Sequence, residues 1–396
     1  MHQISPSLLL CATVLLSLAM PCLAASSAEV LQVRIAYLGY TPARGPLLSN
    51  VIAEPSDAGR RGAELAINDS NSTGRFLKHS YQLDIAEHTD GPSLVAAASA
   101  LHARGVRLFV VNTPAANLRQ LSQALPDSLL LNAGSADDSL RQSQCLSNVL
   151  HTLPSRAMLA DALAQFLTVR KWTRWLLISG STEDDLAYAN ALKRAAKRFG
   201  HNIVAEKPWS FDNDQRRSAQ AEMPLFTQTT EYDVVLVADE RGDFGEYVPY
   251  QTWYPRPVAG TQGLTPTGWH KTVETYGAAQ LQKRFEAHAQ RWMNDRDFAA
   301  WIAVRSIASA VTKLRRNDAQ AIRTLALSDQ LPLDGFKGRK LSFRSWNGQL
   351  RQPIPLVQPR ALVSNSPQEG FLHPNTELDS LGYDRPEVSC DLAANL

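Results

Sequence analysis

The sequence predicts an α/β fold of two doubly wound lobes, each a parallel sheet covered by helices on both faces, joined by a hinge of three chain crossovers. A chain of 396 residues is long enough to build two separate cores. Strand-like and helix-like segments alternate from residue 29 to residue 134, and the same alternation restarts after residue 155. Parallel strands need such crossover helices, so each run of alternating segments predicts one lobe.

The first lobe begins with a strand at 29–40, where Val33, Ile35 and Tyr37 alternate with polar or small residues before Gly39 interrupts the pattern. A loop rich in Pro and Gly, 41–59, follows this strand. The next elements alternate between helix and strand: a helix at 59–71, a strand at 79–90, an Ala-rich helix at 92–105 closed by a glycine, a strand at 106–112, a helix at 114–125 and a strand at 128–134.

The second lobe repeats this order. Its expected helices and strands are a helix at 156–171, a strand at 174–180, a helix at 184–200 and strands at 201–209, 232–239 and 256–263. The remaining chain is expected to form a long helix at 297–314, a shorter helix at 319–329, a hairpin at 339–358 that turns at Asn347-Gly348, and a tail at 359–396. We expect a first lobe of 25–150 with about 277–328, and a second lobe of 151–276 with about 329–396.

The amino terminus has the pattern of a secretory signal. An apolar run from Leu8 to Met20 precedes Pro21 and a short stretch that ends at Ala24, which predicts a signal peptide over 1–24 and a periplasmic location. The apolar run is too short to span a bilayer. Removal of this segment would leave Cys145 and Cys390, which predict one disulfide in an oxidising compartment or, alternatively, two unpaired thiols.

Composition and motifs exclude several function classes. The formal net charge is +2 and the basic residues are scattered, so no nucleic-acid partner is expected. No nucleophile elbow, zinc-protease motif, phosphate loop or dinucleotide fingerprint occurs, and the nine histidines are dispersed. We therefore expect a monomer that is not an enzyme and requires no cofactor.

Several long stretches carry a resemblance to a known family. The two-lobe order with a return helix, "FAAWIAVRSIASAV", resembles periplasmic solute-binding proteins of the Leu/Ile/Val-binding type (type I periplasmic binding fold) that serve ABC transporters. Within that class the chain is similar to the substrate-binding proteins associated with pyrroloquinoline-quinone-dependent alcohol dehydrogenase systems, from about Leu150 to Cys390 and loosely over the first lobe. The stretches that carry this similarity are "HTLPSRAMLADALAQFL", "RKWTRWLLISG", "RRSAQAEMPLFTQ", "YDVVLVADERGDFGEYVPYQTWYPRPVAGTQGL", "GFKGRKLSFRSWNGQLRQPIPL" and "SPQEGFLHPNTELDSLGYDRPEVSC".

The resemblance implies a carrier that closes around a ligand and presents it to a permease in the inner membrane, with a dehydrogenase of the same system as a further partner. Pyrroloquinoline quinone is the ligand that we expect, since a planar tricarboxylate suits aromatic rings and arginine forks. Three alternatives remain: a metal ion or metal chelate for the same system, a small alcohol-derived acid or amino acid, and a sensor or docking protein that uses the tail from Pro359 to Cys390. The long loop at 40–59 departs from ordinary amino-acid binders, as does the lack of an obvious Ser-Thr-Asp set for clamping an α-amino acid.

Ligands of doubly wound sheets bind beyond the carboxyl ends of the strands, and the candidate residues follow from that rule. They lie at strand ends, at the start of the helix after the first crossover, and on the return helix: Asn112, Thr113, Ser135, Arg156, Asp239, Glu240, Thr261, Gln262, Trp269 and Arg305.

These candidates have different expected roles. Arg156 at a helix start is expected to pair with a ligand carboxylate or to be a solvated first-turn residue. The ring of Trp269 is expected to stack on the ligand or to pack in the core, and Arg305 could equally be a core or hinge residue. Asp239, Glu240 and Asp243 are weak candidates for a metal site, because carboxylates at a strand end could bind a hard cation.

Overall fold

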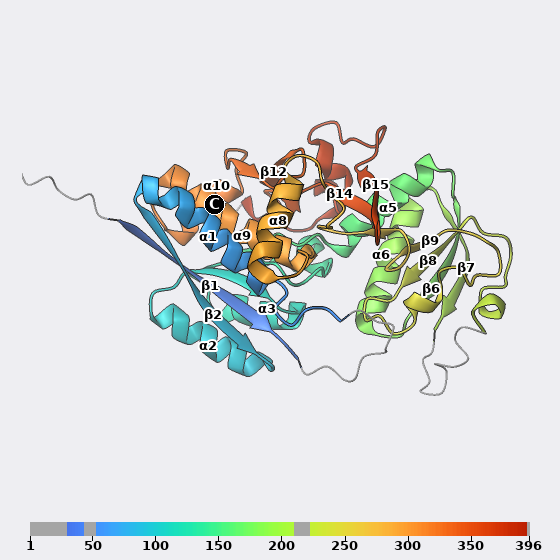
Figure 1. Ribbon diagram of the computed structural model, residues 1–396, viewed down its shortest axis with the longest axis horizontal. Helices are drawn as coiled ribbons and strands as arrows, with labels where there is room; N and C mark the ends of the chain where they lie inside the picture. Colours follow the sequence, from blue (N-terminus) through green and yellow to red (C-terminus); the bar gives the residue numbers. More distant parts are fainter. Residues whose placement is uncertain (1–29, 43–52, 210–221, 394–396) are drawn as a thin grey trace, which may run out of the picture.

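The computed structural model describes residues 30–42, 53–209 and 222–393, so the predicted signal peptide and most of the loop at 41–59 lie outside the described residues. Two lobes stand side by side, the first at the left of Figure 1 and the second at the right. Both contain a parallel sheet with helices packed on its faces, and the predicted fold class is confirmed. No helix among the described residues is long and apolar enough to cross a membrane.

The first-lobe sheet has five parallel strands in the order β2-β1-β3-β4-β5. Its strands are β1 Leu31–Tyr40, β2 His79–His88, β3 Leu108–Asn112, β4 Leu129–Asn132 and β5 Val149–His151. Its helices are α1 Arg60–Leu77, α2 Gly91–Ala103, α3 Ala115–Ala124, α4 Ser139–Gln142, α8 Ala278–Ala289, α9 Asp295–Leu314 and α10 Ala319–Ala326.

Successive residues of the first-lobe strands enter different cores. Ile35 and Tyr37 of β1 pack with α1, α8, α9 and α10, whereas Ala36 and Leu38 pack with α2 and α3. Side chains alternate across a strand, so a continuous apolar run fills both faces of a sheet that is buried on both sides. In the central strands β3 and β4 the polar side chains are therefore confined to the strand ends, at Asn112 and Asn132.

The second lobe is built in the same way around a four-stranded parallel sheet in the order β7-β6-β8-β9. Its strands are β6 Arg174–Ser179, β7 Asn202–Pro208, β8 Val234–Ala238 and β9 Val258–Gly260, and its helices are α5 Arg156–Val169 and α6 Glu183–Phe199. One face packs on α5 and α6, and the other packs on apolar residues that include Trp209, Phe244 and Met223 of the helical segment at 222–226.

The predicted hairpin at 339–358 is only partly correct. Strands β12 Lys340–Phe343 and β13 Leu350–Arg351 pair antiparallel around the Asn347-Gly348 turn, and β11 Leu333–Asp334 extends them. Strand β14 Ile354–Gln358 instead pairs with β10 Thr265–Pro266 and β15 Ala361–Ser366, next to the second lobe. The chain changes lobe between Arg351 and Ile354, because side chains up to Leu350 pack in the first-lobe core, later than the change expected near 329.

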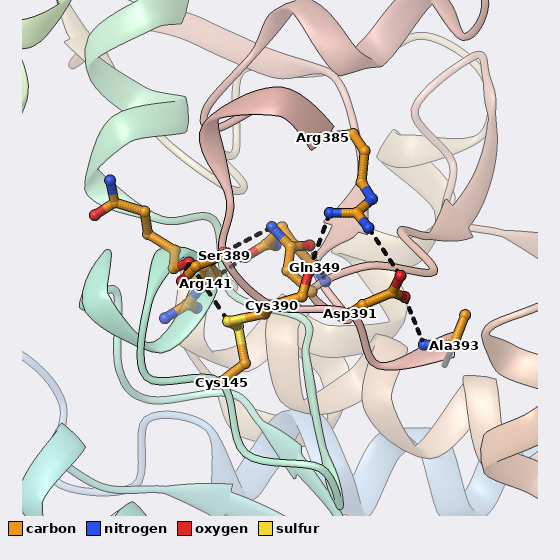
Figure 2. Close-up of a disulfide and its surroundings, with 10 residues drawn as sticks. Arg141, Cys145, Gln349, Arg385, Ser389, Cys390, Asp391 and Ala393 are labelled. Carbon is orange, nitrogen blue, oxygen red and sulfur yellow. Dashed lines mark hydrogen bonds and ion pairs between the residues drawn. A yellow bond between two sulfur atoms is a disulfide. The ribbon is translucent and has the colours of Figure 1, made fainter. Parts of the chain in front are cut away.

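The carboxy-terminal segment touches both lobes. The disulfide between Cys145 and Cys390, with 6.0 Å between the Cα atoms, fastens its end beside α4 of the first lobe, as Figure 2 shows. The predicted pairing of these cysteines is therefore present in the structure. Upstream, the backbone N–H of Gly382 donates to Asp161 on α5, so the same segment is also held by the second lobe.

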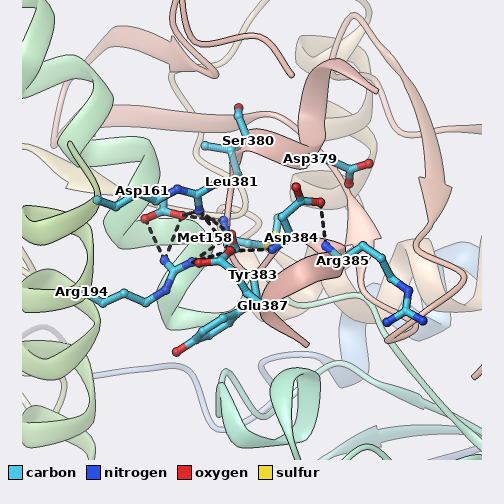
Figure 3. Close-up of polar contacts among 12 residues, drawn as sticks. Met158, Asp161, Arg194, Asp379, Ser380, Leu381, Tyr383, Asp384, Arg385 and Glu387 are labelled. Carbon is cyan, nitrogen blue, oxygen red and sulfur yellow. Dashed lines mark hydrogen bonds and ion pairs between the residues drawn. The ribbon is translucent and has the colours of Figure 1, made fainter. Parts of the chain in front are cut away.

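Asp161 is a fully buried carboxylate that joins α5, α6 and the carboxy-terminal segment (Figure 3). It accepts hydrogen bonds from Arg194 at 3.0 Å, from Arg198 at 2.8 Å and from the Gly382 backbone at 2.8 Å. A buried carboxylate is stable only when its charge and lone pairs are satisfied, which these three donors achieve.

Candidate functional site

Polar side chains gather where the strands of the first-lobe sheet end, and most of them bind one another. The Nδ2 of Asn112 donates to Tyr37 Oη at 3.0 Å and to the carbonyl of Ala58 at 3.1 Å, and its Oδ1 accepts from Arg296 at 3.0 Å. The carbonyl and backbone N–H of Ser135 are bonded to Asn132, so Ser135 shapes the loop after β4. These contacts make a rigid, preorganised edge.

Thr113 differs from its neighbours at this edge. The residue is 2% exposed, and its Oγ1 has no hydrogen-bond partner in the described part of the chain. A Cβ on Gly134 would lie only 2.4 Å from the backbone nitrogen of Thr113. Glycine is therefore needed at position 134 for the loop after β4 to approach the loop after β3. An unsatisfied buried hydroxyl is costly, which makes Thr113 a group that a ligand could satisfy.

Arg296, which the sequence analysis missed, lies at the centre of the first-lobe edge. Its guanidinium binds Asn112, the carbonyl of Gly134 at 3.2 Å and the carboxylate of Glu54 at 2.7 Å. Arg296 lies in the first turn of α9, where the helix dipole disfavours a cation. That unfavourable placement in the "NDRD" stretch is the signal that could have identified it.

Arg156 starts α5 in the second lobe, and Ser155 caps this helix by accepting from the Met158 N–H. The guanidinium of Arg156 donates two hydrogen bonds to the carboxylate of Glu240, at 2.6 and 2.7 Å, and a third to Asp184 at 2.6 Å. Burial alone would lower the pKa of Arg156, but the hydrogen bonds and charges of Glu240 and Asp184 outweigh burial and raise it. Arg156 is therefore buried and paired within its own lobe, so it is not the solvated first-turn residue of the alternative interpretation, and its pairing with a ligand carboxylate stays a prediction.

Asp239 organises the loop after β8. Its two carboxylate oxygens accept from the backbone N–H groups of Gly242 and Asp243 at 2.9 Å, of Phe244 at 2.9 Å and of Gly245 at 2.6 Å. Four donors on one carboxylate leave it little capacity for a ligand. The role of Asp239 is therefore to fix the shape of this loop.

Thr261 and Gln262 follow β9 and lie against the loop that Asp239 holds. The hydroxyl of Thr261 accepts from the backbone N–H of Asp239 at 3.1 Å and donates to the carbonyl of Val237 at 3.2 Å. The Cγ of Gln262 would be 2.7 Å from a Cβ on Gly245, so the side chain of Gln262 lies directly over this loop. The structure thus brings both residues to the edge where the sequence analysis expected them.

The acidic residues proposed for metal binding do not form a metal centre in the described residues, where no group of three His, Cys, Asp or Glu side chains could hold an ion. Asp239 is bound to backbone N–H groups and Glu240 to Arg156. Asp243 is part-exposed and lies 3.4 Å from Arg241, and burial raises the pKa of this carboxyl. These acids remain important for the charge of the second-lobe edge.

Trp269 is in the core of the first lobe. It is 2% exposed, and its ring stacks on Phe298 with 4.7 Å between centroids and 9° between planes. Its Nε1 donates to Gln282 at 3.1 Å. The structure therefore favours the packing interpretation of Trp269, because the crossover that follows β10 carries it away from the strand ends.

Arg305 is remote from the other candidates. It lies nine residues beyond Arg296 on α9, a rise of about 14 Å along the helix axis. Its environment is a separate pocket between α1 and α9.

The edges of the two sheets meet at the first crossover. The backbone N–H of Arg156 donates to the carbonyl of Ala136 at 3.1 Å, and that of Ala157 donates to Asp138 at 3.0 Å. The loop after β4 therefore touches the start of α5, whose Arg156 binds Glu240 after β8. Two parallel sheets that present their carboxyl ends on either side of one crossover define the class of two-lobed α/β ligand-binding proteins.

A family model described as "Periplasmic binding protein" matches residues 42–244, more than half of the chain. The chain belongs to this family. No curated protein matches the sequence. The family consists of periplasmic binding proteins, in agreement with the location predicted from the amino terminus.

Solved structures share the fold at low sequence identity. A branched-chain amino-acid ABC transporter ligand-binding protein from Burkholderia xenovorans is 16% identical, with 91% of this chain and 100% of that chain covered at a TM-score of 0.71. An ABC transporter substrate-binding protein from Sphaerobacter thermophilus is also 16% identical, with 89% and 100% covered at a TM-score of 0.68. A Leu-, Ile-, Val-, Thr- and Ala-binding protein from Brucella ovis, in a closed conformation, is 14% identical. The match covers 86% of this chain and 93% of that chain at a TM-score of 0.65.

Proposed function

We propose that this protein is the solute-binding subunit of an ABC transporter, and that it captures a small polar ligand between the carboxyl ends of its two parallel sheets. The meeting of both edges at the first crossover carries this proposal, because residues 136–138 of the first lobe and Arg156 of the second are in direct contact there. Closure of the lobes about the crossovers would enclose the ligand and create the form that a permease recognises. No chemical step is required of the protein.

The charge of the second-lobe edge favours a ligand with a positive group. Five carboxylates stand there against two guanidinium groups: Asp184, Asp185, Asp239, Glu240 and Asp243 against Arg156 and Arg241. Asp184 is largely exposed and can reach an incoming cation. The opposite edge offers the free hydroxyl of Thr113. A zwitterion such as an amino acid fits this polarity, and solved proteins of the same fold are described as amino-acid binders.

Pyrroloquinoline quinone in an alcohol dehydrogenase system is the second candidate. The observation that favours it is the pair of guanidinium groups at the two edges, Arg156 and Arg296, since arginine forks bind carboxylates. Such a ligand would have to displace Glu240 from Arg156, or arrive with a cation that offsets the neighbouring acids.

A calorimetric titration of ligand-stripped protein tests these proposals. The ligands are a set of neutral, basic and branched amino acids, then pyrroloquinoline quinone with and without Ca²⁺. We expect amino-acid binding that Thr113→Val and Asp184→Asn each weaken by about tenfold, as lost hydrogen bonds to a charged ligand predict. Asp329→Asn, an exposed acid elsewhere, is the matched control.

The other outcomes discriminate between the candidates. Binding of the quinone but of no amino acid would favour the second candidate. Binding of the quinone only in the presence of Ca²⁺ would indicate a metal chelate as the ligand. The absence of binding to every ligand would overturn the amino-acid and quinone proposals together and favour a sensor or docking protein.

A further inference from the structure

A pocket of about 170 Å³ opens between the far halves of α1 and α9, away from the strand ends described above. Its polar lining comes from one charged residue and several hydroxyl groups: Arg305, Ser70, Thr73, Tyr81, Ser309 and Thr312. Helix α1 starts at the strand-end edge, where the N–H of Gly59 donates to Asp297. Because the pocket lies beside its last two turns, the pocket is near the opposite edge of the sheet.

The guanidinium of Arg305 is poorly satisfied. Its Nη1 donates to Ser70 Oγ at 3.2 Å, and Ser70 itself donates to the carbonyl of Ala66 at 2.6 Å. The carboxylate of Asp69 interacts with Arg305 only through its charge, because it accepts from Arg284 at 3.2 Å and from Trp301 at 3.0 Å. A guanidinium carries five N–H donors, so donors remain for a molecule in the pocket.

The burial of the Arg305 guanidinium without a bonded carboxylate favours an anionic ligand. Burial lowers the pKa of Arg305, which reflects the loss of hydration around the charge. The group nevertheless stays charged at neutral pH, as arginine does in proteins. A half-buried charge without a bonded carboxylate is unfavourable, and an anion in the pocket would restore the missing partner.

We propose that this pocket binds a small monocarboxylate with a short apolar tail, its carboxylate on Arg305 and the surrounding hydroxyl groups. A single cation lines the pocket, so a singly charged carboxylate is matched better than a doubly charged phosphate. The remaining wall, which includes Leu77, Ala308 and Pro332, is apolar and suits a short alkyl chain. The volume is comparable to that of an engineered cavity of about 150 Å³ that holds benzene. This site goes beyond the proposed function and does not depend on it.

Butyrate is the probe, with butanol as the uncharged analogue and butylamine as the cationic one, at constant ionic strength. Saturation-transfer NMR on the full mature protein should show saturable butyrate binding and none of the other two. Arg305→Met should weaken butyrate binding at least about tenfold, whereas Arg305→Lys should retain part of it. Arg315→Met, an exposed arginine just beyond the same helix, is the matched control and should change nothing.

A second variant separates binding from folding. Ser309→Phe keeps the charge of Arg305 but fills the pocket, and it should abolish butyrate binding while the melting temperature stays close to that of the wild type. Equal binding of butanol, or unchanged butyrate binding in Arg305→Met or Ser309→Phe, would overturn the proposal. The ligand of the sheet edges should not compete with butyrate, and competition would place butyrate at the edges instead.

Discussion

The ammonium group of Lys337 donates a hydrogen bond to Oε1 of Gln352, and Nε2 of Gln352 in turn donates to the carbonyl of Thr152 at 2.9 Å. Lys337 also donates to the carbonyls of Gly268 and Pro353. Thr152, Gly268 and Pro353 belong to the three different crossovers between the lobes. The buried pair of Lys337 and Gln352 therefore joins all three crossover segments of the hinge. The protonation of Lys337 should accordingly influence the stability of the hinge.

The pH dependence of stability should report on Lys337. Burial lowers the pKa of this lysine from its ordinary value of 10.5 to about 7, although the nearby charge of Asp295 opposes the shift. Between pH 7 and 10.5 the unfolded chain binds more protons at this residue, so the free energy of unfolding should rise with pH by up to about 1.4 kcal/mol per unit. Urea unfolding from pH 7 to 9.5 measures the slope, and Lys337→Met should remove this contribution. An identical slope in the two proteins would show that Lys337 is not the titrating group.

Asp161→Asn should be destabilising. The substitution removes a fully buried acceptor of Arg194 and Arg198, and leaving their donors without a full partner costs about 1–3 kcal/mol. Chemical unfolding measures the loss. Glu387→Gln is the control, because Glu387 also contacts Arg194 but is 40% exposed and should cost less than about 1 kcal/mol. Similar losses in both variants would contradict the importance of burial at Asp161.

Asp239→Ala should weaken ligand binding without removing a ligand contact. Four backbone N–H groups of residues 242–245 would lose their acceptor, the loop would lose its fixed shape, and stability should fall by about 2–4 kcal/mol. Calorimetry with the ligand that the proposed titration finds, together with thermal unfolding, measures the two effects. Asp243→Asn, in the same loop, should leave stability nearly unchanged. Retention of full affinity in Asp239→Ala would show that the loop does not form part of the site.

Replacing Cys145 and Cys390 by Ala and Ser should lower the free energy of unfolding by about 2–5 kcal/mol, because a crosslink over 245 residues restricts the unfolded chain. The fold should persist, since the fully buried Arg344 and the nearby Arg351 still bind Asp379 in the same segment. Denaturant unfolding with and without reductant measures the effect in the wild type, and the double variant should be insensitive to reductant.

Periodicity predicted most strands of the two sheets, because the signal is local and a central apolar run fills both faces of its sheet, but it missed the short edge strand β5 of the first lobe. It predicted the site less well. The position of Arg156 at a helix start is visible in the sequence, but its partner Glu240 lies 84 residues later and no local pattern joins them. Trp269 follows a strand, yet its stacking on Phe298 depends on where the crossover leads. The separation of the pairs β12–β13 and β14–β15 likewise depends on the lobe that each strand joins.

The carboxy-terminal segment has a mechanical consequence for lobe motion. Gly382 is held by Asp161 of the second lobe, whereas its neighbours Leu381 and Tyr383 are held through their carbonyls by Arg344 of the first lobe, and Cys390 is bonded to Cys145. The segment is therefore a short tether that joins the two lobes beside the hinge. The crossovers set the axis about which the lobes rotate, whereas the tether limits how far they can rotate apart.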